Sequence, residues 1–200
     1  MLKFYTNPQS RGRMVRWMLE EVGQPYETVV LEFGDAMQSP DYLAINPMGK
    51  VPALVHDKTI ITETPAIITY LADQFPEAGL MPEDRGAFYR WMFFAAGPLE
   101  MAQMHKALDL APPAKGQGML GYGTYEKLIA ALRDLLTSKT YLIGQRFSAA
   151  DVYMGSHIIW GLTLKTLAPD PIFSAYADHL MARAAYQRAN SKDDALLGEG

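Results

Sequence analysis

The sequence predicts two domains, a small α/β domain followed by an all-helical domain. Patterns typical of strands and helices alternate through residue 76, a segment rich in turn formers and charge follows, and strand signals then disappear. The expected organisation is an N-terminal domain at 1–76, a linker at 77–85 and a helical domain at 86–200.

The first domain is expected to follow the order β-α-β and then β-β-α. Alternating apolar residues mark its strands, and an apolar stripe with helical spacing ends at Gly23. Thr64 is the expected cap of the last helix of this domain, with Pro65 at its first position. The other expected elements are strands at 2–6 and 26–31, an irregular stretch with room for a short helix at 34–46, and a hairpin of 51–56 and 59–62.

The second domain is expected to be helical throughout. Gly97-Pro98 predicts a kink or break within a helical stretch at 86–110. Ser148 and Asp151 have the spacing of a capping box, with aspartate in place of the usual glutamate. The remaining expectations are a Gly/Pro loop at 112–123, an amphipathic helix at 125–136, a helix from Ser148 to about Lys165, a last helix from Phe173 to about Arg188, and a polar, frayed end over the last ten residues.

The 200-residue chain contains no cysteine, so any reactive thiol would have to arrive on a ligand. Disulfides, thiolate zinc sites and a thiol nucleophile borne by the protein are all excluded. His105 and His157 have no partner at the spacing of metal ligands, and no metal site is expected. A net charge of -4 argues against nucleic acid or an anionic membrane as the main partner. Without an export-signal pattern or a run of about 18 apolar residues, the expected location is cytoplasmic.

The most informative motif is NPMGKVPALV at 46–55, followed by ETP at 63–65. Pro52 lies in a short apolar strand, although proline cannot donate to a sheet ladder and is confined to edges, strand starts and bulges. The motif therefore predicts a sheet edge that is open to an extended, peptide-like ligand. Glu63 and Thr64 stand at the start of the next helix, where they could hold the charged end of that ligand.

Four motifs together resemble the cytosolic glutathione transferase family, in its serine-type, bacterial-like branch. They are TNPQSRGR at 6–13, NPMGKVPAL at 46–54, ETPAI at 63–67 and, in the helical half, LIGQRFSAAD at 142–151. The resemblance implies a thioredoxin-like first domain with a cis bond between Val51 and Pro52. It also implies glutathione as co-substrate with no other cofactor, a homodimer, and a role in detoxification.

The resemblance assigns glutathione-binding roles to five residues. The backbone of Val51, exposed beside Pro52, pairs with the cysteinyl backbone of glutathione as an added strand would. Thr64 binds the γ-glutamyl carboxylate at a helix N-terminus, and Glu63 binds the ammonium group. Threonine stands here for the usual serine and keeps the hydroxyl. Lys50 pairs with the glycyl carboxylate in some relatives, and a solvated surface lysine is the alternative.

Ser10 is the candidate for the catalytic hydroxyl, at the turn where thioredoxin-like proteins carry a reactive cysteine pair. The resemblance implies that this hydroxyl donates a hydrogen bond to the sulfur of glutathione and favours thiolate over thiol. A plain helix-capping serine is the alternative. Tyr5, at the end of the first strand, is a rival phenol, although the spacing to the following Arg-Gly-Arg favours Ser10. Arg11 and Arg13 could stabilise a thiolate, but a solvated or inter-subunit ion pair is their expected role.

The helical domain is expected to supply an apolar pocket for an electrophile. The candidate lining residues are Met101, Met104 and Trp160, with Met119 and Leu164 beside them. The predicted function is conjugation of glutathione to a small hydrophobic electrophile, which the sequence does not identify. The alternatives are a non-catalytic binding or scaffold protein on the same fold and a glutathione-dependent isomerase, peroxidase or dehalogenase.

Overall fold

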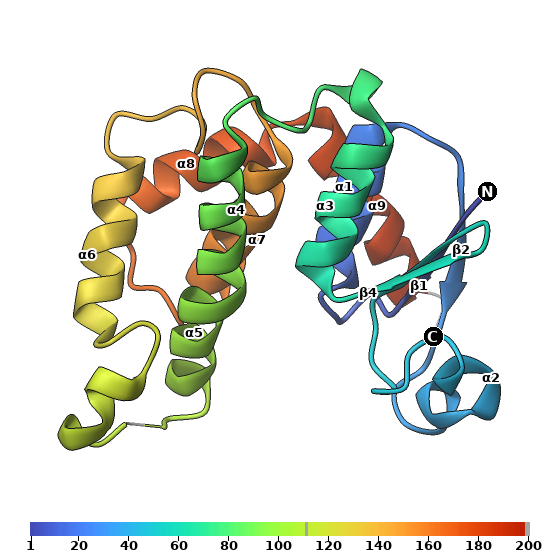
Figure 1. Ribbon diagram of the computed structural model, residues 1–200, viewed down its shortest axis with the longest axis horizontal. Helices are drawn as coiled ribbons and strands as arrows, with labels where there is room; N and C mark the ends of the chain where they lie inside the picture. Colours follow the sequence, from blue (N-terminus) through green and yellow to red (C-terminus); the bar gives the residue numbers. More distant parts are fainter. Residues whose placement is uncertain (111, 199–200) are drawn as a thin grey trace. The chain divides into compact units, whose positions relative to one another are not determined.

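The computed structural model describes residues 1–110 and 112–198, whose contacts form two compact units (Figure 1). One unit comprises Met1–Met81 together with Arg183–Gly200, and the other comprises Pro82–Ala182. The first unit is therefore made from two separate parts of the chain.

The first unit is built on a four-stranded mixed sheet with the order β2-β1-β3-β4. β1 is parallel to β2 and antiparallel to β3, and β3 is antiparallel to β4. The elements of this unit are β1 (Leu2–Thr6), α1 (Gly12–Val22), β2 (Tyr26–Val30), η1 (Asp35–Gln38), α2 (Pro40–Leu43), β3 (Ala53–His56), β4 (Thr59–Thr62), α3 (Thr64–Gln74), η2 (Pro76–Ala78) and α9 (Ala184–Gly198). The predicted thioredoxin-like class and its element order are confirmed.

The two faces of β1 have different roles. Phe4 is fully buried and lies on the face that α1 covers, where the Arg16 guanidinium carbon is 5.2 Å from the centre of its ring. Tyr5, the next residue, points to the opposite face because side chains alternate along a strand. On the first face, α1 and α3 pack together through apolar residues that are fully buried, among them Val15, Met18, Ile68 and Leu71.

The start of α3 differs from the prediction. The helix begins at Thr64, and Glu63 rather than Thr64 is its N-cap, with no capping hydrogen bond from the side chain. Glu63 has φ 69° and ψ 120°, which turns the chain from β4 directly into the helix. Thr64 therefore already belongs to the first helical turn, and Pro65 is the second helical residue.

The C-terminal part of the chain also differs from the prediction. Two helices, α8 (Pro171–Met181) and α9 (Ala184–Gly198), replace the single helix expected to end near Arg188. The predicted fraying is wrong for the described residues, since Asp193 in α9 is fully buried. Residues 199 and 200 lie outside the described residues. α9 packs on α1 and belongs to the first unit, whereas the sequence had placed this segment in the helical domain.

The second unit is all helical. Its other elements are α4 (Arg85–Phe94), η3 (Ala95–Leu99), α5 (Glu100–Ala107), η4 (Ala114–Met119), α6 (Tyr125–Leu136) and α7 (Ala149–Thr163). The break predicted at Gly97-Pro98 is a π-helical turn, which accommodates the missing N–H of Pro98. The capping box of Ser148 and Asp151 is confirmed at the start of α7. Within the described ranges, no helix is long and apolar enough to cross a membrane.

Candidate functional site

The strand register brings three segments to one end of the sheet. Tyr5 of β1 pairs with Ala53 of β3, and Ala53 pairs in turn with Thr62 of β4. Three segments adjoin this row of residues. The turn that carries Ser10 follows β1, the segment with Pro52 precedes β3, and the start of α3 follows β4. The segments that carry the predicted glutathione-binding residues are thus neighbours, although they are far apart in the sequence.

The turn between β1 and α1 is held by hydrogen bonds around Asn7 and Ser10. The Asn7 side chain donates to the Leu31 carbonyl at 2.9 Å and accepts from the Gln9 N–H at 2.9 Å. The Ser10 hydroxyl donates to the Asn7 carbonyl at 2.7 Å and accepts from the Gly12 N–H at 3.0 Å. The Ser10 side chain is half-buried and satisfies one of the N–H groups that a helix start leaves without a partner.

Gly12 allows α1 to begin very close to the end of β1. A Cβ atom at this position would lie 1.9 Å from Thr6 Oγ1 and 3.0 Å from Ser10 Oγ. The first contact is far inside the van der Waals distance, so a larger residue would push the Ser10 turn away from the strand.

The segment before β3 is fixed through the carbonyl of Lys50. This oxygen accepts from the Tyr42 hydroxyl at 2.6 Å and from Asn46 Nδ2 at 2.7 Å. Burial raises the pKa of Tyr42 to about 12, so the phenol remains a donor at neutral pH. The bond between Val51 and Pro52 is cis, as the resemblance implied.

Sequence reasoning missed the supporting roles of Tyr42 and Asn46. Asn46 was part of the quoted motif, but the motif does not show that its side chain folds back onto a carbonyl four residues later. Gly49 completes this loop with φ 58°, and a Cβ there would lie 2.3 Å from Gln38 Nε2. Only glycine fits this position without displacing its neighbours.

Glu63 has a strained backbone at the start of α3. Its positive φ of 69° is unfavourable for a residue with a side chain and costs about 1–3 kcal/mol. Strain of this kind is retained where the surrounding structure needs a particular direction of the chain. The Glu63 side chain is exposed, whereas Thr64 is buried beside the free N–H groups of the helix start.

Tyr5 lies in a packed cluster on the second face of the sheet. Its ring is 5.7 Å from that of Tyr42 between centres, and it packs against a buried group formed by Met37, Tyr42 and Ala53. Tyr5 is half-buried in this environment. The phenol therefore has a clear packing role, whereas the Ser10 hydroxyl is hydrogen-bonded to the backbone of its turn.

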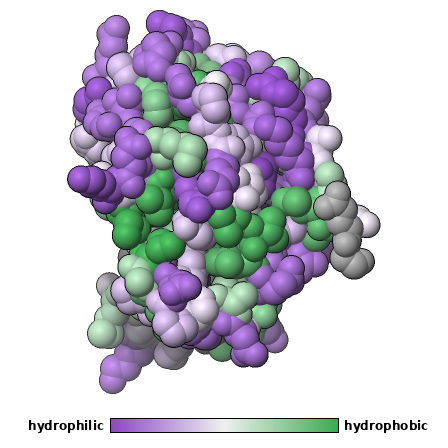
Figure 2. Space-filling model, turned by 90° about the vertical axis from the view of Figure 1, so that its right-hand side faces the viewer, coloured by the Kyte–Doolittle hydropathy of each residue, from purple (hydrophilic) through white to green (hydrophobic). Residues whose placement is uncertain are grey.

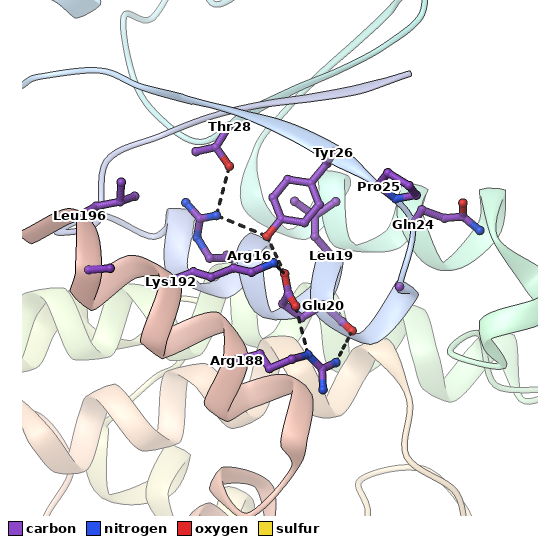
Figure 3. Close-up of a pocket in the computed structure, with 12 residues that line it drawn as sticks. Arg16, Leu19, Glu20, Gln24, Pro25, Tyr26, Thr28, Arg188, Lys192 and Leu196 are labelled. Atoms are coloured by element: carbon purple, nitrogen blue, oxygen red, sulfur yellow. Dashed lines mark hydrogen bonds and ion pairs between the residues drawn. The ribbon is translucent and has the colours of Figure 1, made fainter.

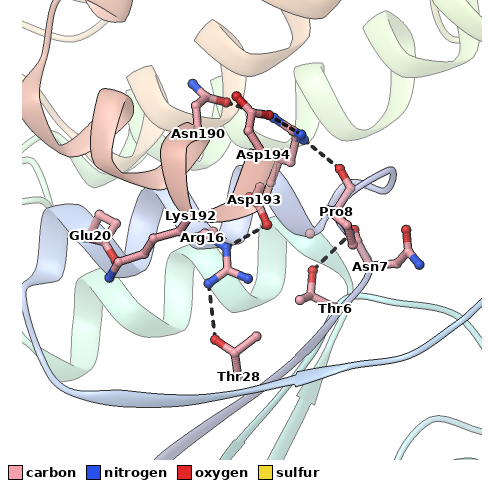
Figure 4. A network of polar contacts seen from close by, with 12 residues as sticks. Thr6, Asn7, Pro8, Arg16, Glu20, Thr28, Asn190, Lys192, Asp193 and Asp194 are labelled. Atoms are coloured by element: carbon pink, nitrogen blue, oxygen red, sulfur yellow. Dashed lines mark hydrogen bonds and ion pairs between the residues drawn. The ribbon is translucent and has the colours of Figure 1, made fainter. Parts of the chain in front are cut away.

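A row of ion pairs joins α1 to α9 within the first unit, and part of it is drawn in Figure 4. The partners run in opposite order along the two helices, which are therefore antiparallel. These α1–α9 ion pairs, counting Arg183 directly before α9, are Arg13–Asp194, Arg16–Asp193, Glu20–Arg188, Glu20–Lys192 and Glu21–Arg183. For Arg13, the observed ion pair lies within the unit rather than between subunits, and the side chain of its partner Asp194 is 64% exposed.

Comparison with known proteins connects this geometry to a family. The family model for the glutathione S-transferase N-terminal domain matches residues 1–73. Over its whole length the chain is 30% identical to the glutathione S-transferase GstA of Escherichia coli O157:H7, and the match covers 99% of that protein. The chain belongs to the cytosolic glutathione transferase family.

Two further relatives are a transferase homologue solved with bound glutathione and an isomerase. A glutathione transferase homologue from Sulfitobacter, solved with bound glutathione, is 30% identical with a TM-score of 0.74, over 96% of this chain and 98% of that one. The maleylacetoacetate isomerase of Pseudomonas aeruginosa is 30% identical over 76% of this chain and 78% of its own length. The serine-type branch within the family stays a prediction.

In this glutathione transferase family member, a cavity of about 760 Å³ lies between α1, β2 and α9 (Figure 3). Its charged side chains bind one another, since Glu20 accepts from the Tyr26 hydroxyl at 2.6 Å, from Lys192 at 2.5 Å and from Arg188 at 3.2 Å. Burial alone would raise the pKa of Glu20, but these hydrogen bonds together hold it below its ordinary value. None of the predicted glutathione-binding residues lines this cavity.

In the second unit, the predicted electrophile-binding residues lie on α5 and α7. Met101 is 41% exposed, and Met104 and Trp160 are half-buried. Of the two further candidates, Leu164 is 65% exposed and Met119 is 91% exposed on η4. A cavity of about 280 Å³ in this unit is lined by other residues, including a hydrogen-bonded pair of His105 and Tyr122. Across the described part of the chain, no three His, Asp or Glu side chains gather to hold a metal ion.

Proposed function

We propose that this protein is a glutathione transferase that binds glutathione at one end of its sheet and conjugates it to a small hydrophobic electrophile. The observation that carries the proposal is the strand register, which makes neighbours of the Ser10 turn, the Val51–Pro52 segment and the start of α3. A relative solved with bound glutathione gives independent support.

Glutathione would lie extended across these three segments. The ladder between β1 and β3 ends at the pair of Tyr5 and Ala53, so the backbone of Val51 lies beyond it and is placed to pair with the cysteinyl backbone. The γ-glutamyl end would meet the start of α3, where free N–H groups and Thr64 suit a carboxylate and Glu63 suits an ammonium group. The exposed Lys50 would pair with the glycyl carboxylate.

The Ser10 hydroxyl would stabilise the thiolate of the bound glutathione. Its hydrogen points to the Asn7 carbonyl, but that oxygen also accepts from the Ser10 N–H at 3.0 Å. The hydroxyl can therefore rotate towards a sulfur without leaving the carbonyl unpaired. The packed position of Tyr5 supports Ser10 as the catalytic group, and the electrophile would be held near Met101, Met104 and Trp160.

The proposal includes a homodimer. One face of the molecule carries apolar side chains in a band between hydrophilic regions (Figure 2). Large apolar side chains are also exposed in both units, with Met48 at 70% and Phe93 at 72%. Contiguous exposed apolar surface often marks a protein contact, so light scattering should give twice the chain mass of 22.3 kDa. Detoxification and a cytoplasmic location stay predictions.

Two measurements test the proposed activity. The protein should be retained on immobilised glutathione, be eluted by free glutathione, and then turn over a generic aryl halide with glutathione. Failure of retention would favour a scaffold protein and contradict the proposal. Retention without aryl halide turnover would favour a glutathione-dependent isomerase, the activity named for the Pseudomonas aeruginosa relative, and a cis-to-trans isomerisation assay would then decide.

A further inference from the structure

Arg13 lies in the first turn of α1 and contacts the preceding turn twice. Its backbone N–H donates to the Ser10 carbonyl at 3.2 Å, and its side-chain Nε donates to the Pro8 carbonyl at 2.6 Å. One residue thereby fixes two carbonyl groups in the turn that carries the candidate catalytic hydroxyl.

The rest of the Arg13 guanidinium is held by α9. Its Nη2 donates to Asp194 Oδ1 at 2.7 Å, and its Nη1 donates to Asn190 Oδ1 at 3.2 Å. Figure 4 shows Asn190 and Asp194 together on α9, on the side of the helix that faces Pro8. A planar guanidinium with donors in fixed directions is suited to join three acceptors in one arrangement. Arg13 therefore connects the C-terminal helix to the Ser10 turn.

Helix stability alone does not explain an arginine at this position. The positive end of the macrodipole makes a cation unfavourable in the first turn of α1. Asp194 is 64% exposed, and an ion pair with so exposed a partner contributes little to stability. The contact with Pro8 is the feature that distinguishes Arg13 from the other α1–α9 ion pairs.

The opposite side of the Ser10 turn has its own anchor. The Asn7 side chain, which is buried, donates to the Leu31 carbonyl directly after β2. The turn is thus held between β2 on one side and α9 on the other, and the second connection passes through Arg13. A small change in the position of this turn would move the hydroxyl relative to a bound sulfur, and displacements of about 1 Å can cost as much as 100-fold in rate.

We propose that Arg13 is a positioning residue, which uses its contacts with α9 to hold the Ser10 hydroxyl in place for the glutathione thiolate. This inference rests on the proposed function. It differs from a direct electrostatic effect, in which the positive charge of Arg13 would itself stabilise the thiolate. The two explanations predict opposite results for removal of Asp194.

Three variants separate these explanations. Arg13→Gln removes the connection, and Asp194→Ala breaks the contact with α9 while it keeps the charge of Arg13. Arg188→Gln is the matched control, because Arg188 also joins α9 to α1 but contacts Glu20 at the other end of the helix. Amide hydrogen exchange of the ligand-free protein would report the Ser10 turn, and the ultraviolet absorbance of the thiolate would report the pKa of bound glutathione.

Positioning predicts that exchange of the Ser10 and Gly12 amides becomes about ten-fold faster in Arg13→Gln and Asp194→Ala and stays unchanged in Arg188→Gln. It also predicts that the pKa of the bound thiol rises in both of the first two variants, by about half a unit, with glutathione affinity within about two-fold. Urea unfolding of all three variants would show that a general loss of stability is not the cause.

Several outcomes would overturn the inference. Unchanged exchange in the turn would show that α9 does not hold it, whether or not the protein binds glutathione. A thiol pKa that falls in Asp194→Ala would establish the direct charge effect instead. Faster exchange with an unchanged thiol pKa would leave Arg13 with a structural role only. If the wild-type protein bound no glutathione, the proposed function would fail first, and the exchange data would still show whether the connection exists.

Discussion

The single hydrogen of the Ser10 hydroxyl has two candidate acceptors, the Asn7 carbonyl in the free protein and the sulfur of glutathione in the proposed complex. In the free protein the hydroxyl donates to the Asn7 carbonyl and accepts from the Gly12 N–H, which makes it part of the start of α1. In the proposed complex the same hydrogen would turn to sulfur. A hydroxyl that is held by the backbone on its acceptor side can change its donor partner by a simple rotation, so little reorganisation is needed when the ligand binds.

We expect Ser10→Ala to raise the pKa of the bound glutathione thiol by about one unit, because the thiolate loses a hydrogen-bond donor, and to leave glutathione affinity nearly unchanged. The same variant leaves the Gly12 N–H without its acceptor and should cost about 1 kcal/mol of unfolding free energy. Spectroscopic titration of the thiolate and urea unfolding measure the two effects.

Tyr5→Phe is the matched control for this prediction. It keeps the aromatic ring that packs on Tyr42 and removes only the hydroxyl, so activity and thiol pKa should stay at the wild-type values. Activity that survives in Ser10→Ala but is lost in Tyr5→Phe would assign the catalytic hydroxyl to Tyr5.

At the scale of elements, α1 carries charges that are unsuited to an isolated helix. Arginines lie near its start and Glu20 and Glu21 near its end, which is the reverse of the distribution that the helix macrodipole favours. The opposite charges on α9 explain this distribution. Arg16 and Asp193 are the most deeply buried of these partners, with side chains 3% and 0% exposed. Such a pair specifies which helix packs here and in which direction, and breaking it would leave a buried charge.

The pH dependence of stability should reveal the bonds of Glu20. Its pKa in the folded protein lies below the ordinary value of 4.5, so the stability that it contributes is complete above that value and is lost as the pH falls through the lower, folded-state pKa. Glu20→Gln should therefore be less stable than the wild type at about pH 7, and the difference should shrink towards about pH 3.

Urea unfolding at a series of pH values measures this difference. Glu27→Gln is the control, because Glu27 forms an ion pair with Lys3 at 3.1 Å in which both side chains are substantially exposed, and such pairs contribute little. A difference between wild type and Glu20→Gln that stays constant with pH would contradict the assigned hydrogen bonds.

At the scale of the whole molecule, the first unit depends on both ends of the chain. The chain leaves this unit after Met81, forms the helical unit, and returns at Arg183 to supply α9. Without α9, the polar face of α1 would lose its partners, and Arg16, which is 2% exposed, would lose the cover that keeps it from water.

We expect a chain that ends at Ala182 to lose most of the stability of the first unit and its retention on glutathione. A chain that ends at Asp194 keeps every one of the α1–α9 ion pairs, so it should remain folded and be retained. Circular dichroism during urea unfolding and the glutathione column measure both properties. Equal unfolding midpoints for the chain ending at Ala182 and the full-length protein would show that α9 is dispensable.

Much of the first unit could be predicted from the sequence because its signals are local. Alternation marks β1, helical spacing marks α1, and the motif around Pro52 marks the approach to β3. The N-cap at Glu63 could not be predicted, since a positive φ at a glutamate has no sequence signature and arises from the geometry between β4 and α3. The support of the Lys50 carbonyl by Tyr42 was missed for a similar reason, because it joins side chain and backbone across a loop.

The sequence did not predict α9 as a separate helix that continues beyond Arg188, because its apolar content is low. Hydrophobic periodicity detects helices that bury an apolar stripe, whereas α9 also buries charge, and Asp193 looks solvent-exposed by residue type alone. A signal was nevertheless present in the order of charges. Arginines precede acidic residues in both α1 and the last helical segment, an order that pairs opposite charges when two helices lie antiparallel.

The split origin of the first unit has a consequence for synthesis. A ribosome releases the sheet and α1 early, but the last helix of that unit emerges only after the whole of the helical unit. The nascent chain therefore has the segments of the helical unit available before the unit that begins at its N-terminus can close. Until then, Arg13 and Arg16 on α1 lack their aspartate partners on α9, and that face of α1 stays accessible to chaperones.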